Sequence, residues 1–314
     1  MESYTRTKLN SIEDIFKLNK LFMSSFIFRG QSDTEWALET SYERNGFPLK
    51  VGYYNSEEIA MIYEFKRKYN LYSQYKQPEE DNYVEWLAIM QHYGAPTRLL
   101  DFSESPFIAL YFAAIGVDKP WEIYKDENRD YQQYKIYTLY CVNKDNINRR
   151  INKEYELHYL YKEPFYKNKM DIFYIKYAND FIKMGEVGKE IVSLVFPIES
   201  QIYSDRLSRQ QGLFLMPTNL KYSFEKNLLS TFQEVEKEEI NFSDIGFDEL
   251  ISHSEQHGNV VGKGEHEVIN ILKFEIKSPA SDILYNLKQM NITAETLFGG
   301  LEGFSKSLPQ KHIL

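Results

Sequence analysis

Residues 81–116, DNYVEWLAIMQHYGAPTRLLDFSESPFIALYFAAIG, combine two apolar helical patterns with a short polar link. Asp81 suits the N-cap of the first helix, and Gly94 can adopt the left-handed conformation with which helices commonly end. Pro106 suits the first turn of the second helix, because its missing N–H has no partner to lose there. This second helix, which runs to Gly116, is apolar almost all round, so we expect it to be buried.

The link between the two helices, QHYGAPTRLLDFSES, places many polar side chains beside an apolar helix. Buried charges in proteins are usually paired, so we expect Arg98 to pair with Asp101. In one interpretation this pair and the nearby hydroxyls stabilise a tight buried turn. In the other they line a cleft. For an isolated pair the first interpretation is favoured, because structural ion pairs resemble sites.

A second arginine stands at the end of a short apolar strand, in Phe28-Arg29-Gly30-Gln31. The strand fixes the backbone behind Arg29, and the planar guanidinium in front suits a phosphate or a carboxylate. The alternative is a salt bridge that locks the following loop.

These two stretches resemble the FRG domain, a family of bacterial and phage proteins named after a Phe-Arg-Gly motif. The segment MQHYGAPTRLLDFSESPFIALYFA resembles the family's central signature. Phe28-Arg29-Gly30 resembles the motif itself, and Trp36 and Leu38 follow it at the family's spacing. Members occur in mobile elements and phage conflict, so the resemblance implies a defence or toxin role.

Two later blocks extend the resemblance along the chain. RLSRQQGLF, residues 206–214, looks like a third family block. LFGGLEG, residues 297–303, resembles the family's closing LFPDLDG-like element, with Gly299 and Gly300 in place of Pro and Asp. The resemblance therefore covers nearly the whole chain in order.

Length and composition limit the class of protein. The chain has 314 residues, is 43% hydrophobic and carries a formal charge of -9, which argues against broad nucleic-acid binding. Cys141 is the single cysteine, so no internal disulfide is expected, and we expect no metal site. No apolar run is long enough for a membrane span and no signal region is evident, so we expect a cytoplasmic protein.

The fold expected is α+β, with a mixed or antiparallel core sheet flanked by helices in one domain, residues 1–314. Strands are expected near residues 26–28, 136–142, 191–196, 212–216 and 268–276. The core would comprise residues of about 20–143 and 191–304, and residues of about 144–190 would form an inserted helical region.

The polar set suits a cleft for an anionic, nucleotide-like ligand. Two arginines could hold phosphate, and amide and imidazole groups could contact a ribose or base edge. The candidate ligand-binding residues are Phe28, Gly30, Gln31, Gln91, Tyr93, Thr97, Arg98, Asp101, Ser103 and Arg206. The candidate catalytic residues are Arg29, His92, Gln210 and Gln211. We expect Arg29, His92, Arg98, Asp101 and Gln210 or Gln211 to converge on one cleft.

The layout is also similar to that of mono-ADP-ribosyltransferases, which implies NAD as a ligand. Those enzymes carry an arginine on the first core strand, a Ser/Thr-containing second strand and a Gln/Glu-x-Glu on a later strand. Phe28-Arg29-Gly30 looks like the first element, residues 97–103 resemble the second loosely, and Gln210 and Gln211 lack the glutamate of the third. Either Glu104 or Glu199 supplies that acid, or the module binds NAD-like ligands without turnover. The rival interpretation is a non-enzymatic recognition module that senses a phage protein or a nucleic acid.

Overall fold

The computed structural model describes residues 4–18, 26–46, 56–73, 77–117, 136–159, 170–186, 191–200, 205–232, 243–257 and 269–313. The strands are β1 (Tyr4–Leu9), β2 (Phe26–Gln31), β3 (Leu100–Ser103), β4 (Tyr137–Asn143), β5 (Val195–Ile198), β6 (Gly212–Pro217), β7 (Ser243–Asp244) and β8 (Ile271–Ile276). The helices are α1 (Ile12–Leu18), α2 (Ser41–Arg44), α3 (Ser56–Tyr72), α4 (Tyr83–His92), α5 (Pro106–Ile115), α6 (Lys144–Tyr159), α7 (Met170–Glu186), α8 (Asp205–Arg209), α9 (Phe224–Thr231), α10 (Phe247–His257), α11 (Ala280–Gln289), α12 (Ala294–Phe298) and α13 (Gly300–Ile313).

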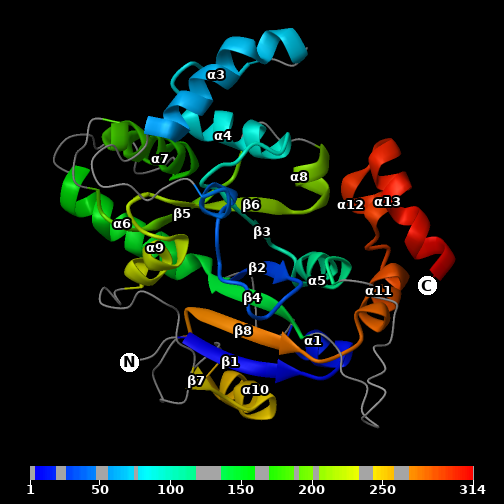
Figure 1. Ribbon diagram of the computed structural model, residues 1–314. Helices are drawn as coiled ribbons and strands as arrows, with labels where there is room; N and C mark the ends of the chain where they lie inside the picture. Colours follow the sequence, from blue (N-terminus) through cyan, green and yellow to red (C-terminus); the bar gives the residue numbers. More distant parts are fainter. Residues whose placement is uncertain are drawn as a thin grey trace.

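The eight strands form one mixed sheet in the order β5-β6-β3-β2-β4-β8-β1-β7 (Figure 1). The pairs from β5 to β8 are antiparallel, whereas β1 runs parallel to both β8 and β7. The predicted α+β class with a mixed sheet flanked by helices is therefore confirmed.

The five predicted strands correspond to β2, β4, β5, β6 and β8. The sequence analysis missed β1, β3 and β7. β1 reads YTRTKL, in which polar residues outnumber apolar ones, so its pattern does not indicate a buried strand. β3 has four residues and lies within the stretch interpreted as a link. Its neighbours β2 and β6 come from distant parts of the sequence, and pairing with them makes it a strand.

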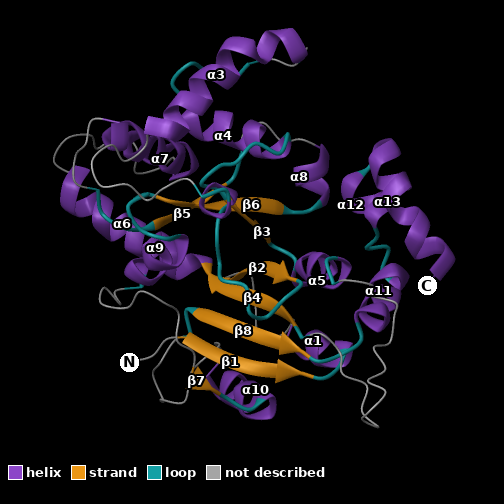
Figure 2. Ribbon diagram, in the orientation of Figure 1, coloured by secondary structure: helices purple, strands orange, loops and turns teal. Residues whose placement is uncertain are grey.

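Helices cover both faces of the sheet and create two apolar cores (Figure 2). One core contains side chains from α3, α4, α6, α7 and α9, and the other contains side chains from α1, α5, α10, α11 and α12. Successive side chains of a strand point to opposite faces. In β2, Ile27 belongs to the first core and Phe26 and Phe28 to the second.

The two helices of the central stretch form as expected, with one shift at a helix cap. Asn82, rather than Asp81, caps α4 by accepting a hydrogen bond from the backbone N–H of Glu85. Gly94 follows α4 with a φ of +83°, the left-handed conformation predicted for it. Ser105 caps α5, and Pro106 occupies its first turn. Seven of the ten residues of α5 are buried, so the prediction that this helix is buried is confirmed.

The region predicted as an inserted helical segment contains α6 and α7. Both helices pack on the first core through buried side chains such as Ile147, Ile151, Tyr177 and Phe181. Tyr177 and Phe181 contact the ring of Phe196 on β5. Within the described ranges, none of the helices has the length and apolar character that crossing a bilayer requires.

Candidate functional site

The Phe-Arg-Gly triplet lies on β2, in the middle of the sheet, and its residues face alternate sides. Phe28 is 2% exposed and packs in the second core. Arg29 and Gln31 belong to the opposite face by the alternation of the strand. The register places Arg29 opposite Tyr140 and Gln31 opposite Thr138 on β4. Phe28 therefore supports the sheet from one side, while the polar pair projects from the other.

Gly30 allows α5 to approach β2 closely. A Cβ atom at this position would lie 1.9 Å from the carbonyl oxygen of Ala109 and 2.7 Å from the amide nitrogen of Ala113. Both contacts are with helix backbone, which cannot move aside as a flexible side chain can. A side chain at this position would push α5 away from the sheet, so the glycine is explained by packing alone.

Arg29 connects β2 to β3 through its side chain. Its Nη1 donates a 2.8 Å hydrogen bond to the backbone carbonyl of Asp101, and its Nε is buried without a hydrogen-bond partner among the described residues. Burial lowers the pKa of the guanidinium from its ordinary value, and Asp101 opposes that shift. Arginine nevertheless stays protonated in proteins. Arg29 is thus a partly exposed cation with one donor unused in the described structure.

Gln31 and Thr138 form a cross-strand pair beside Arg29. Gln31 is 7% exposed, and its Nε2 donates to the carbonyl of Ala37 at 3.0 Å. The Gln31 Oε1 and the Oγ1 of the fully buried Thr138 have no hydrogen-bond partner among the residues that the structure describes. Directly opposed side chains on neighbouring strands have Cβ atoms about 4.5–5.5 Å apart. Two unsatisfied buried polar groups therefore lie next to each other.

The loop after β2 covers these groups. Thr34 donates its backbone N–H to the carbonyl of Ile136 at 3.2 Å and accepts a 2.8 Å hydrogen bond from Lys273 Nζ. Lys273 also lies 5.7 Å from the ring centroid of Tyr140, and burial lowers the pKa of its amine. Trp36, on the same loop, is 54% exposed. We call Arg29, Gln31, Thr138, Tyr140 and Lys273 the Arg29 cluster.

Carboxylates act on the residues of the Arg29 cluster. Burial raises the pKa of the Tyr140 hydroxyl, and the charges of Glu225 and Glu275 act in the same direction while Arg29 opposes them. Glu225 Oε1 accepts a 2.9 Å hydrogen bond from the backbone N–H of Leu38. The cluster thus presents cationic donors together with uncharged acceptors.

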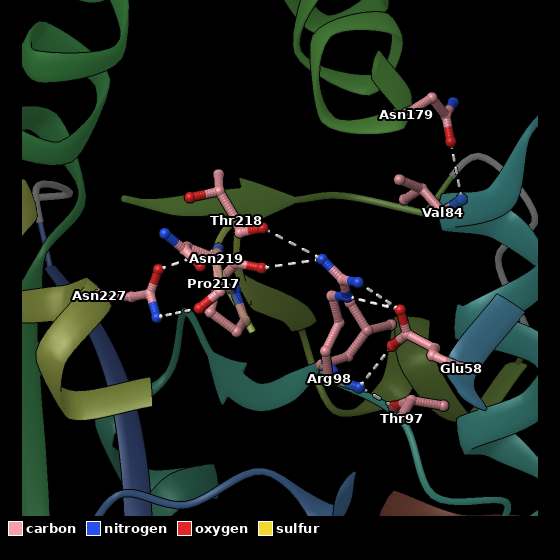
Figure 3. Close-up of polar contacts among 10 residues, drawn as sticks. Glu58, Val84, Thr97, Arg98, Asn179, Pro217, Thr218, Asn219 and Asn227 are labelled. Atoms are coloured by element: carbon pink, nitrogen blue, oxygen red, sulfur yellow. Dashed lines mark hydrogen bonds and ion pairs between the residues drawn. The ribbon is translucent and has the colours of Figure 1, made fainter. Parts of the chain in front are cut away.

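Arg98 belongs to a different network, and its predicted pairing with Asp101 is wrong. Arg98 and Glu58 are both fully buried, and Arg98 Nη2 lies 2.5 Å from Glu58 Oε2 (Figure 3). Arg98 Nε donates to the same carboxylate oxygen at 2.7 Å, and Nη1 reaches the carbonyls of Pro217 and Thr218 at 3.4 Å. The side chain of Asp101 faces solvent instead. Arg98 lies at a bend before β3, whereas Asp101 lies on β3 itself, so the two side chains do not meet.

The residues next to Arg98 complete this buried anchor. Thr97 is fully buried, and its hydroxyl contacts Gln91 Oε1. Its backbone carbonyl accepts from the N–H of Tyr42 at 3.0 Å. Thr97 and Arg98 have no exposed surface and bond to Gln91 and Glu58 inside the protein, so they support the fold around a site.

The third and fourth sequence blocks contact each other at a separate place. Gln210 Nε2 donates to the carbonyl of Leu297 at 3.3 Å, and the guanidinium of Arg206 lies 4.7 Å from the ring centroid of Phe298. Ser103 Oγ donates to the backbone carbonyl of Gln210 at 2.8 Å, which connects this contact to β3. The polar groups of these two blocks therefore dock α12 and α13 on the turn before β6.

We call α12 and α13 the docked tail. His92 lies close enough for a charge on this tail to act on it, and Tyr93 and Gln211 are considered with it. The pKa of the His92 imidazole is lowered by burial and by the charge of Arg206, while Glu302 on α13 opposes the shift. Tyr93 is 59% exposed and packs edge-on against His92, with ring centroids 5.0 Å apart. Gln211 has a φ of +45°, and its carbonyl accepts from the N–H of Glu104 at 2.9 Å.

The structure thus divides the candidate residues expected in one cleft among three networks. Arg29 and Gln31 lie in the Arg29 cluster, Arg98 in the buried anchor, and His92 with Gln210 near the docked tail. Arg29 and Arg98 do share a side of the sheet, since Arg29 alternates with Phe28 of the second core and Arg98 pairs with Glu58 of α3, a helix of the first core. The two acids proposed for a transferase, Glu104 and Glu199, both pair with Lys144 at 2.8 and 3.3 Å.

Two important residues were missed from the sequence. Glu58 is a carboxylate on the buried face of α3, four residues before Ile62, which is also fully buried. A charge at such spacing indicates a buried partner elsewhere in the chain. Thr138 carries a hydroxyl group in a strand whose seven residues are all buried. A polar side chain within such a strand was the available signal. Within the described ranges, no group of three or more His, Cys, Asp or Glu side chains is arranged to hold a metal ion.

Comparison with known proteins identifies part of the chain. Residues 24–120 match the sequence model of the FRG domain, as the two motifs predicted. No curated protein gives a significant match, and neither does any solved structure. The resemblance to mono-ADP-ribosyltransferases accordingly receives no support. The match to the FRG-domain model covers residues 24–120, which include both Arg29 and the Arg98 anchor.

Proposed function

We propose that this chain binds a small anionic, nucleotide-like ligand at the Arg29 cluster. The observation that supports the proposal is a set of buried polar atoms that have no partner among the residues the structure describes: Arg29 Nε, Gln31 Oε1 and Thr138 Oγ1. Buried polar groups in proteins nearly always have a hydrogen-bond partner, and leaving one unsatisfied costs about 1–3 kcal/mol. Three such atoms on one face of adjacent strands suggest a position that a ligand or ordered water fills.

The charge of the cluster favours an anion. Arg29 offers a free Nε–H, and Lys273 uses one of its donors on Thr34. A guanidinium has five donors, and Arg29 donates one of them to the carbonyl of Asp101, so it retains capacity for a phosphate or carboxylate. Partial exposure of Arg29, Gly30 and Lys273 leaves the cluster open to solvent on one side. Trp36 at the margin could stack on a planar base.

The arrangement supports binding more strongly than turnover. A transferase that cleaves the bond between nicotinamide and ribose needs a carboxylate against the developing positive charge. The acids nearest the cluster, Glu225 and Glu275, act on the pKa of Tyr140, and Asp101 acts on that of Arg29. Any ADP-ribosyltransferase-like reaction would draw on these acids rather than on Glu104 or Glu199. A role as an effector in bacterial defence or in a toxin system rests on the family resemblance.

The test is a calorimetric titration of the purified chain with NAD, ADP-ribose and AMP. Arg29→Met should weaken binding by about tenfold or more, since a hydrogen bond to a charged group contributes about 1.5–3 kcal/mol. Arg67→Met is the matched control, because Arg67 is 71% exposed and pairs with Glu64 on its own helix. Saturable heat that survives Arg29→Met unchanged, or no binding by the unaltered chain, would refute the proposal. Release of nicotinamide in the same samples distinguishes turnover from binding.

A second candidate function, recognition of a partner protein, is favoured by an apolar groove of about 720 Å³ between α3 and the end of α4. Its walls include Met61, Phe65, Met90, Tyr93 and Ala95, and the last three come from the MQHYGAP segment of the family signature. Such a groove suits the apolar face of a helix. A photocrosslinking residue at position 93 should capture a discrete protein in cells, whereas one at the half-exposed Tyr285 should not. Equal labelling at both positions would remove this candidate.

A further inference from the structure

The hydrogen-bonding groups of the Arg29 cluster define the ligand more closely than its charge does. We infer that Gln31 and Thr138 recognise a planar edge on which an N–H donor stands beside an acceptor, as in an exocyclic amino group next to a ring nitrogen or in a primary carboxamide. This inference rests on the proposed binding of a nucleotide-like ligand at this cluster.

The orientation of the Gln31 amide is fixed by its own backbone. Nε2 donates to the carbonyl of Ala37, and a carbonyl can only accept. Rotating the amide by half a turn would place two acceptors against each other and lose that hydrogen bond. Oε1 is therefore the atom left without a partner, and it can be satisfied only by a donor. A carboxylate, which carries no proton to donate at neutral pH, would not satisfy it.

Thr138 supplies the complementary group on the neighbouring strand. Its hydroxyl is fully buried and unpartnered among the described residues, and its register partner on β2 is Gln31. A hydroxyl can donate as well as accept, and it rotates to suit its partner. Gln31 Oε1 can only accept, so it would pair with a donor of the ligand, while the Thr138 hydroxyl would donate to an adjacent acceptor of the ligand. One planar group could therefore satisfy both buried atoms.

Arg29 would then bind a different part of the same ligand. It lies two residues before Gln31 on the same face of β2, about 6.6 Å along the strand. Its free Nε–H requires an acceptor, which a ribose hydroxyl or a phosphate of a nucleotide provides. Arg29 thus binds the anionic or hydroxyl-bearing part of the ligand, and Gln31 and Thr138 bind its amino or amide edge. Gln31 becomes the residue that determines specificity.

The test compares mononucleotides that differ in the donor alone. AMP is compared with purine riboside 5′-monophosphate, which lacks the 6-amino group. Nicotinamide mononucleotide is compared with nicotinic acid mononucleotide, whose carboxylate has no N–H. In at least one of these pairs, the donor-bearing member should bind about tenfold or more tightly to the unaltered chain, because a buried acceptor left unpaired is costly. The pair that discriminates identifies whether the edge is a base or a carboxamide.

Variants locate the discrimination at the proposed atoms. Gln31→Leu should reduce the preference within the discriminating pair to about onefold, and Thr138→Val should reduce it without removing the phosphate-dependent part of binding. Gln77→Leu, at an exposed position, should leave the preference unchanged. If all four mononucleotides bind equally, the inference is overturned while the proposed function stands. If none of them binds, the proposed function itself fails. The comparison on the unaltered chain decides the matter even if a variant does not fold.

Discussion

Arg29 and Arg98 lie on the same face of one sheet, but they differ in how completely the protein surrounds them. Arg98 is fully buried against a carboxylate that is itself fully buried, and two backbone carbonyls lie near its remaining nitrogen. Arg29 makes one hydrogen bond to a backbone carbonyl and keeps a donor without a described partner. An arginine paired with a buried carboxylate belongs to the interior of the fold, whereas one held by a backbone carbonyl remains available to a ligand.

The largest expected effect is at the Arg98 anchor. Arg98→Met or Glu58→Met alone leaves a buried charge unpaired, so each should lower the free energy of unfolding by about 3–5 kcal/mol in urea denaturation. The double variant Arg98→Met/Glu58→Met should recover much of that loss, because both charges are removed together. Asp101→Asn is the control and should change stability by less than about 0.5 kcal/mol. A severe effect of Asp101→Asn would mean that Arg98 depends on Asp101 after all.

The second effect tests whether the glycine of the motif is structural while its arginine is not. Gly30→Ala places a methyl group within 1.9 Å of a helix carbonyl, so it should destabilise the protein by about 1–3 kcal/mol or more. Gly246→Ala is matched to it, because the nearest atom there is 3.8 Å away. Thermal melts of both variants provide the measurement. Equal melting temperatures would show that α5 does not press on β2 as closely as described.

A smaller effect on stability is expected at Arg29, and it sharpens the comparison of the two arginines. Arg29→Met removes one hydrogen bond between strands and should lower the free energy of unfolding by about 0.5–1.5 kcal/mol. The loss should be well below that of Arg98→Met in the same urea titration. A loss as large as that of Arg98→Met would make Arg29 a structural residue, and its effect on ligand binding would then say nothing about contact.

The smallest effect concerns the docked tail. Because the folded protein lowers the pKa of His92, the unfolded chain binds more protons below the ordinary histidine pKa of 6.5. Stability should therefore fall as pH drops through that value, and His92→Gln should reduce this fall slightly. The change is small because His92 is exposed and its charge is screened. Arg206→Gln, which removes a repulsive charge, should also flatten the profile. Urea titrations at about pH 5.5 and 7.5 are sufficient, and a steeper fall in His92→Gln would contradict the sign.

The sequence by itself determined the α+β class, the two helices of the central stretch, five strands and the match to the FRG-domain model. These follow from local properties: apolar periodicity, helix caps such as Pro106, and a motif read directly from neighbouring residues. Gly94 in the left-handed conformation and the burial of α5 belong to the same category. Each depends on interactions within a few residues, so a single sequence contains enough information to predict them.

Only the tertiary structure decided which polar groups meet. Glu58 lies 40 residues from Arg98, and Thr138 lies 107 residues from Gln31, so no local pattern could pair them. Spacing made Asp101 the obvious partner of Arg98, but the bend before β3 brings Arg98 to Glu58 and leaves the side chain of Asp101 exposed. The buried carboxylate partner that distinguishes Arg98 from Arg29 is brought to it by strand register and helix packing. Both depend on the burial of side chains that are distant in sequence, which is why the sequence predicts the fold better than it predicts the site.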